Sequence, residues 1–274
     1  METTSTYSVE NQTFTINCPS TLSQKFWITN GACHANYAVV FAQTIVKGKN
    51  EGINAFIVQI RDEKMDTMPG VTIEDMGVKL GLNGIDNGRL IFNNVVIPRE
   101  AMLNKYNDVT ADGTFISETP KINARFFKVA DRLLSGRLCI SAMSMSGTKA
   151  VLHHTIRYSQ QRMAVGPNGK SNTPIMSFQL QQNAILPLLA RTIVLNMMYN
   201  AAKDHFEDPK GKENESIRTF CAAKCLVTWN MEHTAAICRE RCGGGSFLSS
   251  SEIPLGMLGA HSGMTAEGDN RVLM

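Results

Sequence analysis

Glu267 is the residue whose sequence context most suggests chemistry. It stands between a Gly- and Ser-rich segment, residues 243–266, interpreted here as a loop, and DNRVLM, which has the pattern of the first turns of a helix. At such a position backbone N–H groups are free to meet an anion or a carbonyl oxygen. The alternative is a structural glutamate that the helix dipole favours at a helix start. The residue types alone leave both interpretations open.

A second segment with unusual residues is KFWITNGACHANYAVVFAQ, residues 25–43, which places Trp27 and Thr29 at the head of a strand-like run. A tryptophan at a strand start usually packs against neighbours, and threonine is a common strand former. By itself, therefore, this segment does not indicate a cofactor.

The seven cysteines do not predict a disulfide framework or a metal centre. Their number is odd, and a chain of this length does not need covalent cross-links, so we expect reduced thiols. Two pairs have the four-residue spacing of one helix face rather than that of a zinc knuckle, and two further pairs of neighbours lack partners at ligand spacing. These pairs are Cys221 with Cys225, Cys238 with Cys242, Cys33 with His34, and His153 with His154. We predict no metal site.

Composition excludes several classes of function. The chain has 274 residues, of which 43% are hydrophobic and 19% charged, and a net charge of +3. Lysine and arginine are scattered, so no nucleic-acid groove is predicted. We find no apolar run as long as a membrane span and no signal peptide at the N-terminus, so we expect no membrane span.

The first part of the chain, residues 1–117, has the patterns of β-structure. TYSVENQTFTIN alternates apolar and polar residues, and YAVVFAQTIV, INAFIVQI and GRLIFNNVVI are rich in β-branched and aromatic residues. Turn-forming segments separate these runs. Several strands at this spacing predict an antiparallel sandwich or barrel.

From about residue 122 the periodicity becomes helical. Apolar residues recur every three or four positions in three long segments, residues 129–162, 178–206 and 215–242, and short loops join them. We therefore predict an antiparallel α-helical bundle in residues 118–274, open on one side. The predicted fold class is α+β, with a β-domain in residues 1–117 followed by this bundle.

The order of several short motifs resembles the acyl-CoA dehydrogenase and oxidase superfamily. WITNG lies in the β-part, LSGR and RMAVG lie on the first long helix, FQLQQ opens the second, CGGG follows the third, and AEGDN is terminal. The segments GVKLGLNGIDNGRLIFNNVVIPREAMLN and EGDNRVLM look most like peroxisomal acyl-CoA oxidases. The resemblance covers essentially the whole chain.

This resemblance implies a flavoprotein that removes the α-proton of a fatty acyl-CoA and transfers the β-hydride to FAD. Glu267 is then the base, and its own backbone N–H helps to bind the thioester oxygen. A dry pocket would make the carboxylate a better base. Arg137 and Gly268 are implied to contact the acyl-CoA substrate.

The resemblance also implies a set of FAD-binding residues. Trp27 packs near the flavin ring, Ile28 contributes backbone contacts, and Thr29 hydrogen-bonds the flavin nitrogen that accepts the hydride. The remaining residues implied are Arg162, which reaches the diphosphate of a neighbouring subunit, Phe178, Gln179, Gly243, Gly244, Asp269 and Asn270. These cross-subunit contacts imply a homodimer.

Three functions remain open. The first is a peroxisomal acyl-CoA oxidase that passes electrons to O2 and forms H2O2 in the first step of fatty acid β-oxidation. The second is a dehydrogenase that uses an electron-transfer flavoprotein, which Trp27, Ile28 and Thr29 favour. The third is a non-catalytic, truncated relative, since the family's N-terminal helical domain is expected upstream of this sequence. We therefore expect the chain alone to bind FAD poorly and to turn over little.

Overall fold

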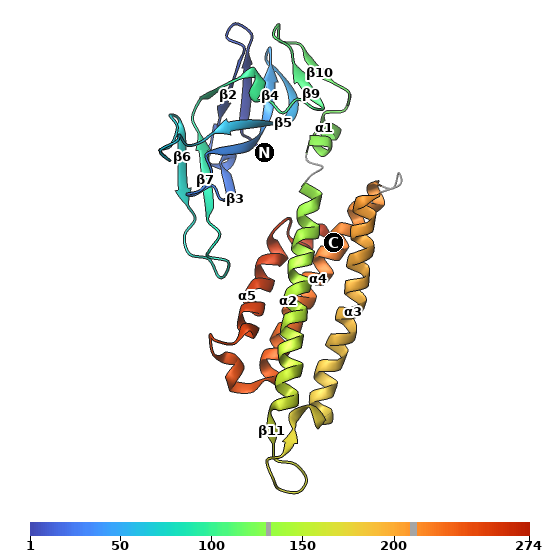
Figure 1. Cartoon of the computed structure of the whole chain (residues 1–274). Coiled ribbons are helices and arrows are strands. Elements are labelled where there is room, and N and C mark those ends of the chain that lie inside the picture. Colours follow the sequence, from blue (N-terminus) through green and yellow to red (C-terminus); the bar gives the residue numbers. More distant parts are fainter. Residues whose placement is uncertain (130–132, 209–212) are drawn as a thin grey trace. The chain divides into compact units, whose positions relative to one another are not determined.

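The computed structural model describes residues 1–129, 133–208 and 213–274. The chain divides into two compact units, Met1–Lys79 with Asn83–Asp131, and Leu80–Leu82 with Arg132–Met274 (Figure 1). Parts of the predicted first helix and of the loop between the second and third helices, residues 130–132 and 209–212, lie outside the described residues.

The first unit contains two main sheets. A five-stranded sheet has the order β5-β4-β1-β2-β8, and a three-stranded sheet has the order β3-β7-β6. All their pairings are antiparallel except that of β1 with β4, which is parallel. The strands are β1 (Thr4–Ser8), β2 (Thr13–Asn17), β3 (Lys25–Thr29), β4 (Tyr37–Val46), β5 (Lys49–Gln59), β6 (Val71–Asp75), β7 (Asn87–Phe92) and β8 (Val95–Pro98). A separate hairpin joins β9 (Asn107–Val109) to β10 (Phe115–Ser117).

Alternating side chains from both sheets build one core. In β2, TFTIN places Phe14 and Ile16 inside, as the period-two pattern predicts. They pack with Phe56 of the five-stranded sheet and with Leu90 and Phe92 of the three-stranded sheet. The predicted β-sandwich is therefore confirmed, with its core between the two sheets.

Helix α1 (Ile122–Val129) belongs to the first unit, although the sequence placed the domain boundary between residues 117 and 118. The Arg125 guanidinium contacts the Glu51 carboxylate at 3.1 Å, and both side chains are nearly buried. Gly52 leaves the space that Ile122 occupies, because a Cβ at Gly52 would lie 2.8 Å from its side chain. These contacts hold α1 against β5.

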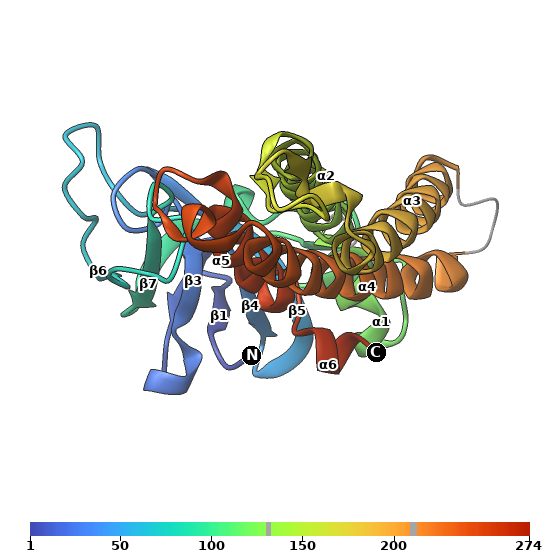
Figure 2. The ribbon, with the colours of Figure 1, turned by 90° about the horizontal axis from the view of Figure 1, so that it is seen from below.

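In the described residues, the second unit is a bundle of four helices of 14 or more residues. Their directions alternate along the chain (Figure 1). They are α2 (Leu133–Gln161), α3 (Gln179–Glu207), α4 (Glu213–Arg241) and α5 (Glu252–Thr265). Helix α4 contacts the other three, and it lies beside α5 in both views (Figure 2). A short hairpin, β11 (Met163–Ala164) with β12 (Thr173–Pro174), connects α2 to α3, and α6 (Asn270–Leu273) ends the described chain.

Helix α5 corrects the sequence interpretation, which had treated residues 243–266 as a loop. Ser251 caps its start, because the hydroxyl accepts a hydrogen bond from the Ile253 N–H. Two of its glycines are sites of close packing: a Cβ at Gly256 would lie 2.4 Å from Val151, and one at Gly263 would lie 3.0 Å from Ser144. Glycine therefore lets α5 approach α2 closely, a function that composition alone does not distinguish from loop flexibility.

Helix α3 corrects the expectation that no segment is long and apolar enough to cross a membrane. Among the described residues, one helix of 29 residues, Gln179–Glu207, meets that criterion, with a mean hydropathy of 1.2 over a window that is 22% buried. A single helix of this kind is weak support for a membrane span, because core helices of globular proteins meet the same criterion. Several of its large apolar side chains are exposed: Leu186, Ile193, Val194 and Met197.

Candidate functional site

The loop between α5 and α6 presents Glu267 in a backbone conformation that few residues adopt. Glu267 has φ +56° and Gly268 has φ +109°. The left-handed region is costly for a residue with a Cβ, so surrounding contacts must maintain it. The Glu267 residue is exposed to solvent in the described structure.

Two neighbouring residues at the start of α2 fix the position of Glu267. A Cβ at Gly136 would lie 2.5 Å from both the Cδ and the Oε2 atoms of Glu267, so the carboxylate rests directly on the helix backbone. The next residue, Arg137, donates a hydrogen bond from Nε to the Glu267 carbonyl oxygen at 3.3 Å. Arg137, predicted as a substrate contact, thus also fastens the loop of the predicted base.

Lys224 on α4 holds the same loop from inside the bundle. Its side chain is completely buried, and Nζ donates to the Met264 carbonyl at 3.2 Å, to the Gly268 carbonyl at 2.5 Å and to Asn270 Oδ1 at 2.9 Å. Burial lowers the pKa of the Lys224 ammonium below its ordinary value. The sequence analysis missed this residue, although a lysine on the apolar face of a helix, directly before Cys225, was a detectable signal.

The residues after Glu267 are engaged within the loop itself. Asn270 is buried, and its Nδ2 donates to Thr228 Oγ1 at 2.9 Å, so both ends of its side-chain amide have partners. Asp269 Oδ1 accepts the Arg271 N–H at 2.8 Å and caps α6. The structure therefore shows Asp269 and Asn270 ordering the loop that carries Glu267.

A pocket at the opposite end of the bundle brings together four of the predicted FAD-binding residues. It has a volume of about 680 Å³, and Arg162, Phe178, Gly243 and Gly244 line it. Arg162 follows the last turn of α2, Phe178 precedes α3, and the glycines follow α4. The loop arrangement thus gathers three helix ends around one cavity.

Gln179 is exposed and does not line this pocket, whereas Gln181 does. Gln181 is buried and donates from Nε2 to Ser159 Oγ at 2.9 Å and to the Arg241 carbonyl at 3.1 Å. The FQLQQ motif therefore places a different glutamine at the cavity wall, because helical geometry turns Gln179 outward.

The pocket offers cationic groups without protein partners. Within the described residues, the exposed Arg162 side chain forms no hydrogen bond or ion pair, and the buried Nε of Arg241, which also lines the cavity, has no hydrogen-bond partner. A buried donor without a partner is costly, so a ligand acceptor would relieve it. A Cβ at Gly243 or Gly244 would meet open space, which leaves room for a ligand against the backbone. Arg241 was not predicted from the sequence.

In the first unit, the Trp27–Thr29 segment lies at an irregularity of β3. The register with β7 shifts between Lys25 and Ile28, and Trp27 has φ +61°. Trp27 is 55% exposed and Thr29 is also exposed, whereas Ile28 packs against the sandwich core. This arrangement anchors the segment through Ile28 and leaves the Trp27 and Thr29 side chains free to contact a ligand.

Comparison with known proteins gives the family. Residues 131–274 match the acyl-CoA oxidase C-alpha1 domain, and residues 1–95 match the acyl-CoA dehydrogenase middle domain. Peroxisomal acyl-coenzyme A oxidase 3 of Arabidopsis thaliana is 37% identical over 279 residues, which cover 100% of this chain and 41% of the relative. The chain thus belongs to the acyl-CoA oxidase family, and it spans about two fifths of the length of the curated relatives that it matches.

Solved structures agree with this assignment. Acyl-CoA oxidase 1 of Arabidopsis thaliana matches with a TM-score of 0.89 and 30% identity, over 99% of this chain and 42% of that chain. Acyl-CoA oxidase-1 of Caenorhabditis elegans, complexed with FAD and ATP, matches with a TM-score of 0.83 and 30% identity, over 100% of this chain and 41% of that chain. The predicted α+β fold and the predicted family are both confirmed.

Proposed function

We propose that the chain contributes the middle and helical parts of an FAD-dependent acyl-CoA oxidase. The reaction is the α,β-dehydrogenation of a fatty acyl-CoA to the trans-2-enoyl-CoA, with electrons passed to O2 to give H2O2. Relatives named as peroxisomal acyl-CoA oxidases support this activity and a peroxisomal location in fatty acid β-oxidation.

The Glu267 carboxylate is the proposed base for the α-proton. The contacts of its loop with Gly136, Arg137 and Lys224 position the backbone that carries the carboxylate before substrate binds, so less reorganisation of the loop remains for the reaction step. Bound FAD supplies the hydride acceptor. Arg137 and Gly268 are the proposed contacts to the acyl-CoA.

The chain's own residues fit FAD at two places. Trp27 and Thr29 are exposed on an anchored strand, as contacts to a flavin ring require. Arg162, Arg241 and the open glycines supply charge and space for a diphosphate and its nucleotide. Phe178, Gln179 and the loop at Asp269 and Asn270 complete the proposed set.

The length of α2 supports a homodimer. This helix has 29 residues, which corresponds to about 43 Å. Gly136 and Arg137, which hold the Glu267 loop, are its fourth and fifth residues, whereas the pocket of Arg162 follows its last turn. An extended dinucleotide does not bridge that distance, so the two ends of one bundle serve two different FAD molecules.

The observation that carries the proposal is the Glu267 carboxylate resting on Gly136 in a loop that Lys224 holds. The test is H2O2 release from palmitoyl-CoA by the complete gene product, compared with its Glu267→Gln variant. We expect the variant to keep its bound flavin and to lose turnover. Glu207→Gln, at an exposed position of the same unit, should retain it. Equal turnover in the Glu267→Gln and Glu207→Gln variants would reject the assignment of the base.

A dehydrogenase is the second candidate, because the segment Trp27–Thr29 with Asn30 is similar to that of dehydrogenases. The two functions differ in the electron acceptor. Parallel assays with O2 and with an electron-transfer flavoprotein separate them: an oxidase releases H2O2 in step with substrate consumption, and a dehydrogenase consumes substrate only with the protein acceptor. Loss of both activities, with Glu267 intact, would instead support a non-catalytic relative.

A further inference from the structure

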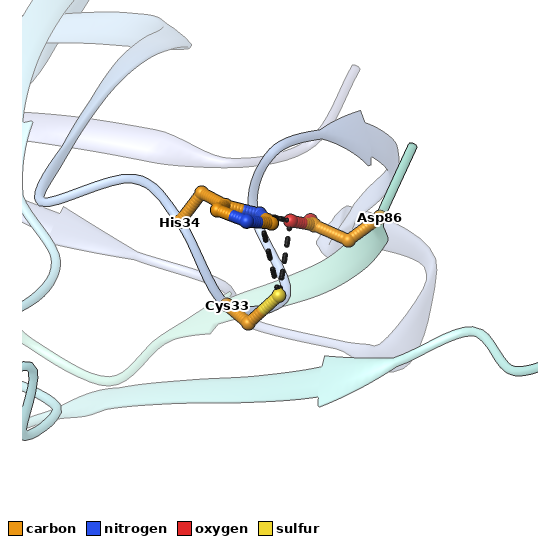
Figure 3. A group of neighbouring side chains, drawn as sticks. All are labelled: Cys33, His34 and Asp86. Carbon is orange, nitrogen blue, oxygen red and sulfur yellow. Dashed lines mark hydrogen bonds and ion pairs between the residues drawn. The ribbon is translucent and has the colours of Figure 1, made fainter. Parts of the chain in front are cut away.

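Three side chains of the first unit converge at one point outside the proposed FAD and acyl-CoA contacts. Cys33 and His34 lie in the loop between β3 and β4, and Asp86 directly precedes β7 (Figure 3). Cys33 Sγ lies 3.1 Å from Asp86 Oδ2 and 3.4 Å from His34 Nδ1, and His34 Nδ1 also contacts Asp86 Oδ2. The structure thus supplies the partner that sequence spacing alone had not shown for Cys33 and His34.

The backbone around this cluster is held by other groups. The Arg61 guanidinium is buried and donates to the Ala35 carbonyl at 2.8 Å and to the Gly31 carbonyl at 3.0 Å. Asp86 uses its other oxygen, Oδ1, to accept the Ala32 N–H at 2.8 Å. The Asp86 side chain is only 8% exposed, whereas that of His34 is 68% exposed. A fixed carboxylate therefore faces a thiol and an imidazole that solvent can reach.

The donor set suits a divalent ion of the zinc type. Zinc binds thiolate, imidazole and carboxylate groups at about 2.0–2.3 Å in tetrahedral geometry, which separates neighbouring ligand atoms by about 3.5 Å. Cys33 Sγ already lies near that spacing from both Asp86 Oδ2, at 3.1 Å, and His34 Nδ1, at 3.4 Å, whereas His34 Nδ1 and Asp86 Oδ2 are in direct contact and must move apart to bind one ion. A thiolate and a carboxylate also balance the charge of a divalent ion, and water fills the fourth position on the exposed side.

A reactive catalytic thiol is the competing interpretation of the same cluster, and the hydrogen bonding opposes it. The Cys33 thiol donates its hydrogen bond to the Asp86 carboxylate at 3.1 Å, and an acceptor at that place stabilises the protonated thiol. A thiol held protonated is a poor nucleophile. A bound divalent ion, in contrast, displaces the thiol proton by direct coordination.

We propose that Cys33 Sγ, His34 Nδ1 and Asp86 Oδ2 bind a zinc-type divalent ion that links the β3–β4 loop to the start of β7. On binding, the bond from sulfur to the metal replaces the S–H bond, and the proton leaves to solvent without any change in oxidation state. The ion ties down the loop that directly follows Trp27 and Thr29, so it stabilises the folded first unit by mass action. This site is independent of the proposed oxidase activity.

The first test uses Co²⁺ as a spectroscopic probe for zinc on the 274-residue chain. We expect one equivalent of Co²⁺ to bind with a thiolate-to-cobalt charge-transfer band, and Zn²⁺ to displace it. Cys33→Ala should abolish the band, and His34→Gln should weaken binding about tenfold or more. Both residues are exposed, so the fold should persist, which the unfolding midpoint in chelator checks. Cys139→Ala, at another exposed cysteine, is the matched control and should retain the band.

The second test uses the unmodified chain. Zn²⁺ should slow the alkylation of Cys33 by iodoacetamide, measured by mass spectrometry of the peptide that contains it, and should leave the alkylation of Cys139 unchanged. A charge-transfer band that survives Cys33→Ala, the absence of any band, or equal zinc effects on Cys33 and Cys139 would each overturn the proposed site.

Discussion

At one end of the helical unit the polar groups pair with one another, whereas at the other end two arginine side chains keep donors without protein partners in the described part of the chain. The Glu267 loop is held by Lys224 and Arg137, and the buried amide of Asn270 has partners for both its oxygen and its nitrogen. Around the pocket, the side chain of Arg162 and the Nε of Arg241 have no protein partners within the described residues, whereas Gln181 is hydrogen-bonded. The two ends of one bundle therefore differ in whether their charged side chains have hydrogen-bond partners in the protein.

This difference indicates two kinds of preparation for a ligand. The Glu267 end is ordered in advance, as expected where a carboxylate must meet one carbon atom of a substrate. At the Arg162 end, guanidinium N–H groups have no acceptors and the pocket is open, as expected where a multiply charged cofactor supplies the missing acceptors. Variants at each end should therefore fail differently: the first in turnover and local stability, the second in cofactor retention.

The largest effect is expected for Lys224→Met. The variant removes three hydrogen bonds and leaves partly buried acceptors at Met264 and Gly268 and a buried one at Asn270 unsatisfied, so the free energy of unfolding of the helical unit should fall by about 3 kcal/mol. Urea unfolding measures this through Trp229 on α4, in a Trp27→Phe background that leaves one tryptophan.

Lys203→Met is the matched control for this variant. Lys203 is exposed on α3, so its replacement should change the free energy of unfolding by less than about 0.5 kcal/mol. If the two methionine variants unfold at the same urea concentration, Lys224 does not hold the Glu267 loop. The main reason to regard that end of the bundle as ordered in advance would then be lost.

Gly136→Ala should separate turnover from folding. Its new Cβ would lie 2.5 Å from the Glu267 carboxyl group, and a shift of about 1 Å in a catalytic group can lower turnover about 100-fold. Alanine favours a helix over glycine by about 1 kcal/mol, so helix stability should not fall. Rates of H2O2 release by the complete gene product, with flavin absorbance as the measure of cofactor content, check both statements.

Gly244→Ala is the corresponding change at the other end. A Cβ there meets open space, so the fold should be unaffected, but the pocket for the cofactor becomes smaller. We expect loss of flavin during gel filtration without a change in the unfolding midpoint. If Gly244→Ala retained its flavin but lost turnover, the two ends of the bundle would not differ in the way proposed here.

The main elements of the fold followed from the sequence because their patterns are local. Alternation in TFTIN and the helical period of the three long segments each predicted an element that the structure contains. Helix α5 was missed because Gly256 and Gly263 look like loop residues until Val151 and Ser144 are seen to require them. The structure places helix α1 in the first unit through its contact with Glu51, which lies far away in the sequence and therefore leaves no local signal.

The site residues divide in the same way. Glu267, Arg162 and Gly243 are predicted site residues because each belongs to a short motif that a family resemblance can carry. Lys224 gave only an indirect signal, as a lysine on the apolar face of a helix, and Arg241 gave none, because the hydrogen bonds that these residues make or leave unmade join different helices of the bundle. A pattern along one chain segment does not contain that information.

Arg162→Gln tests the open end with a smaller expected effect. Hydrogen bonds to charged groups contribute about 2 kcal/mol, so loss of the guanidinium should weaken FAD binding about thirtyfold. Arg157→Gln, at an exposed position on α2 outside the pocket, controls for the loss of one positive charge. Flavin fluorescence titrations of the complete gene product provide the affinities. Equal weakening by both variants would indicate general electrostatic attraction rather than a built site.

The smallest effect concerns the pH dependence of stability and compares two lysines, the partly buried Lys25 of the first unit and the buried Lys224 of the second. Burial lowers the pKa of Lys25 to about 8 and also lowers that of Lys224 from the ordinary 10.5. Above each lowered pKa the unfolded chain binds more protons than the folded chain, so stability rises with pH up to about 10.5.

Each lysine should account for the rise of the free energy of unfolding with pH in its own unit. Lys25→Met should flatten the rise that begins near pH 8 when unfolding is followed through Trp27, with Trp229 replaced by phenylalanine. Lys224→Met should flatten the rise followed through Trp229. Since Lys25 donates to one carbonyl, that of Phe41, whereas Lys224 donates to three acceptors, deprotonation should also loosen the Lys224 loop more. A rise of the same slope in variant and wild type would show that other groups control stability at high pH.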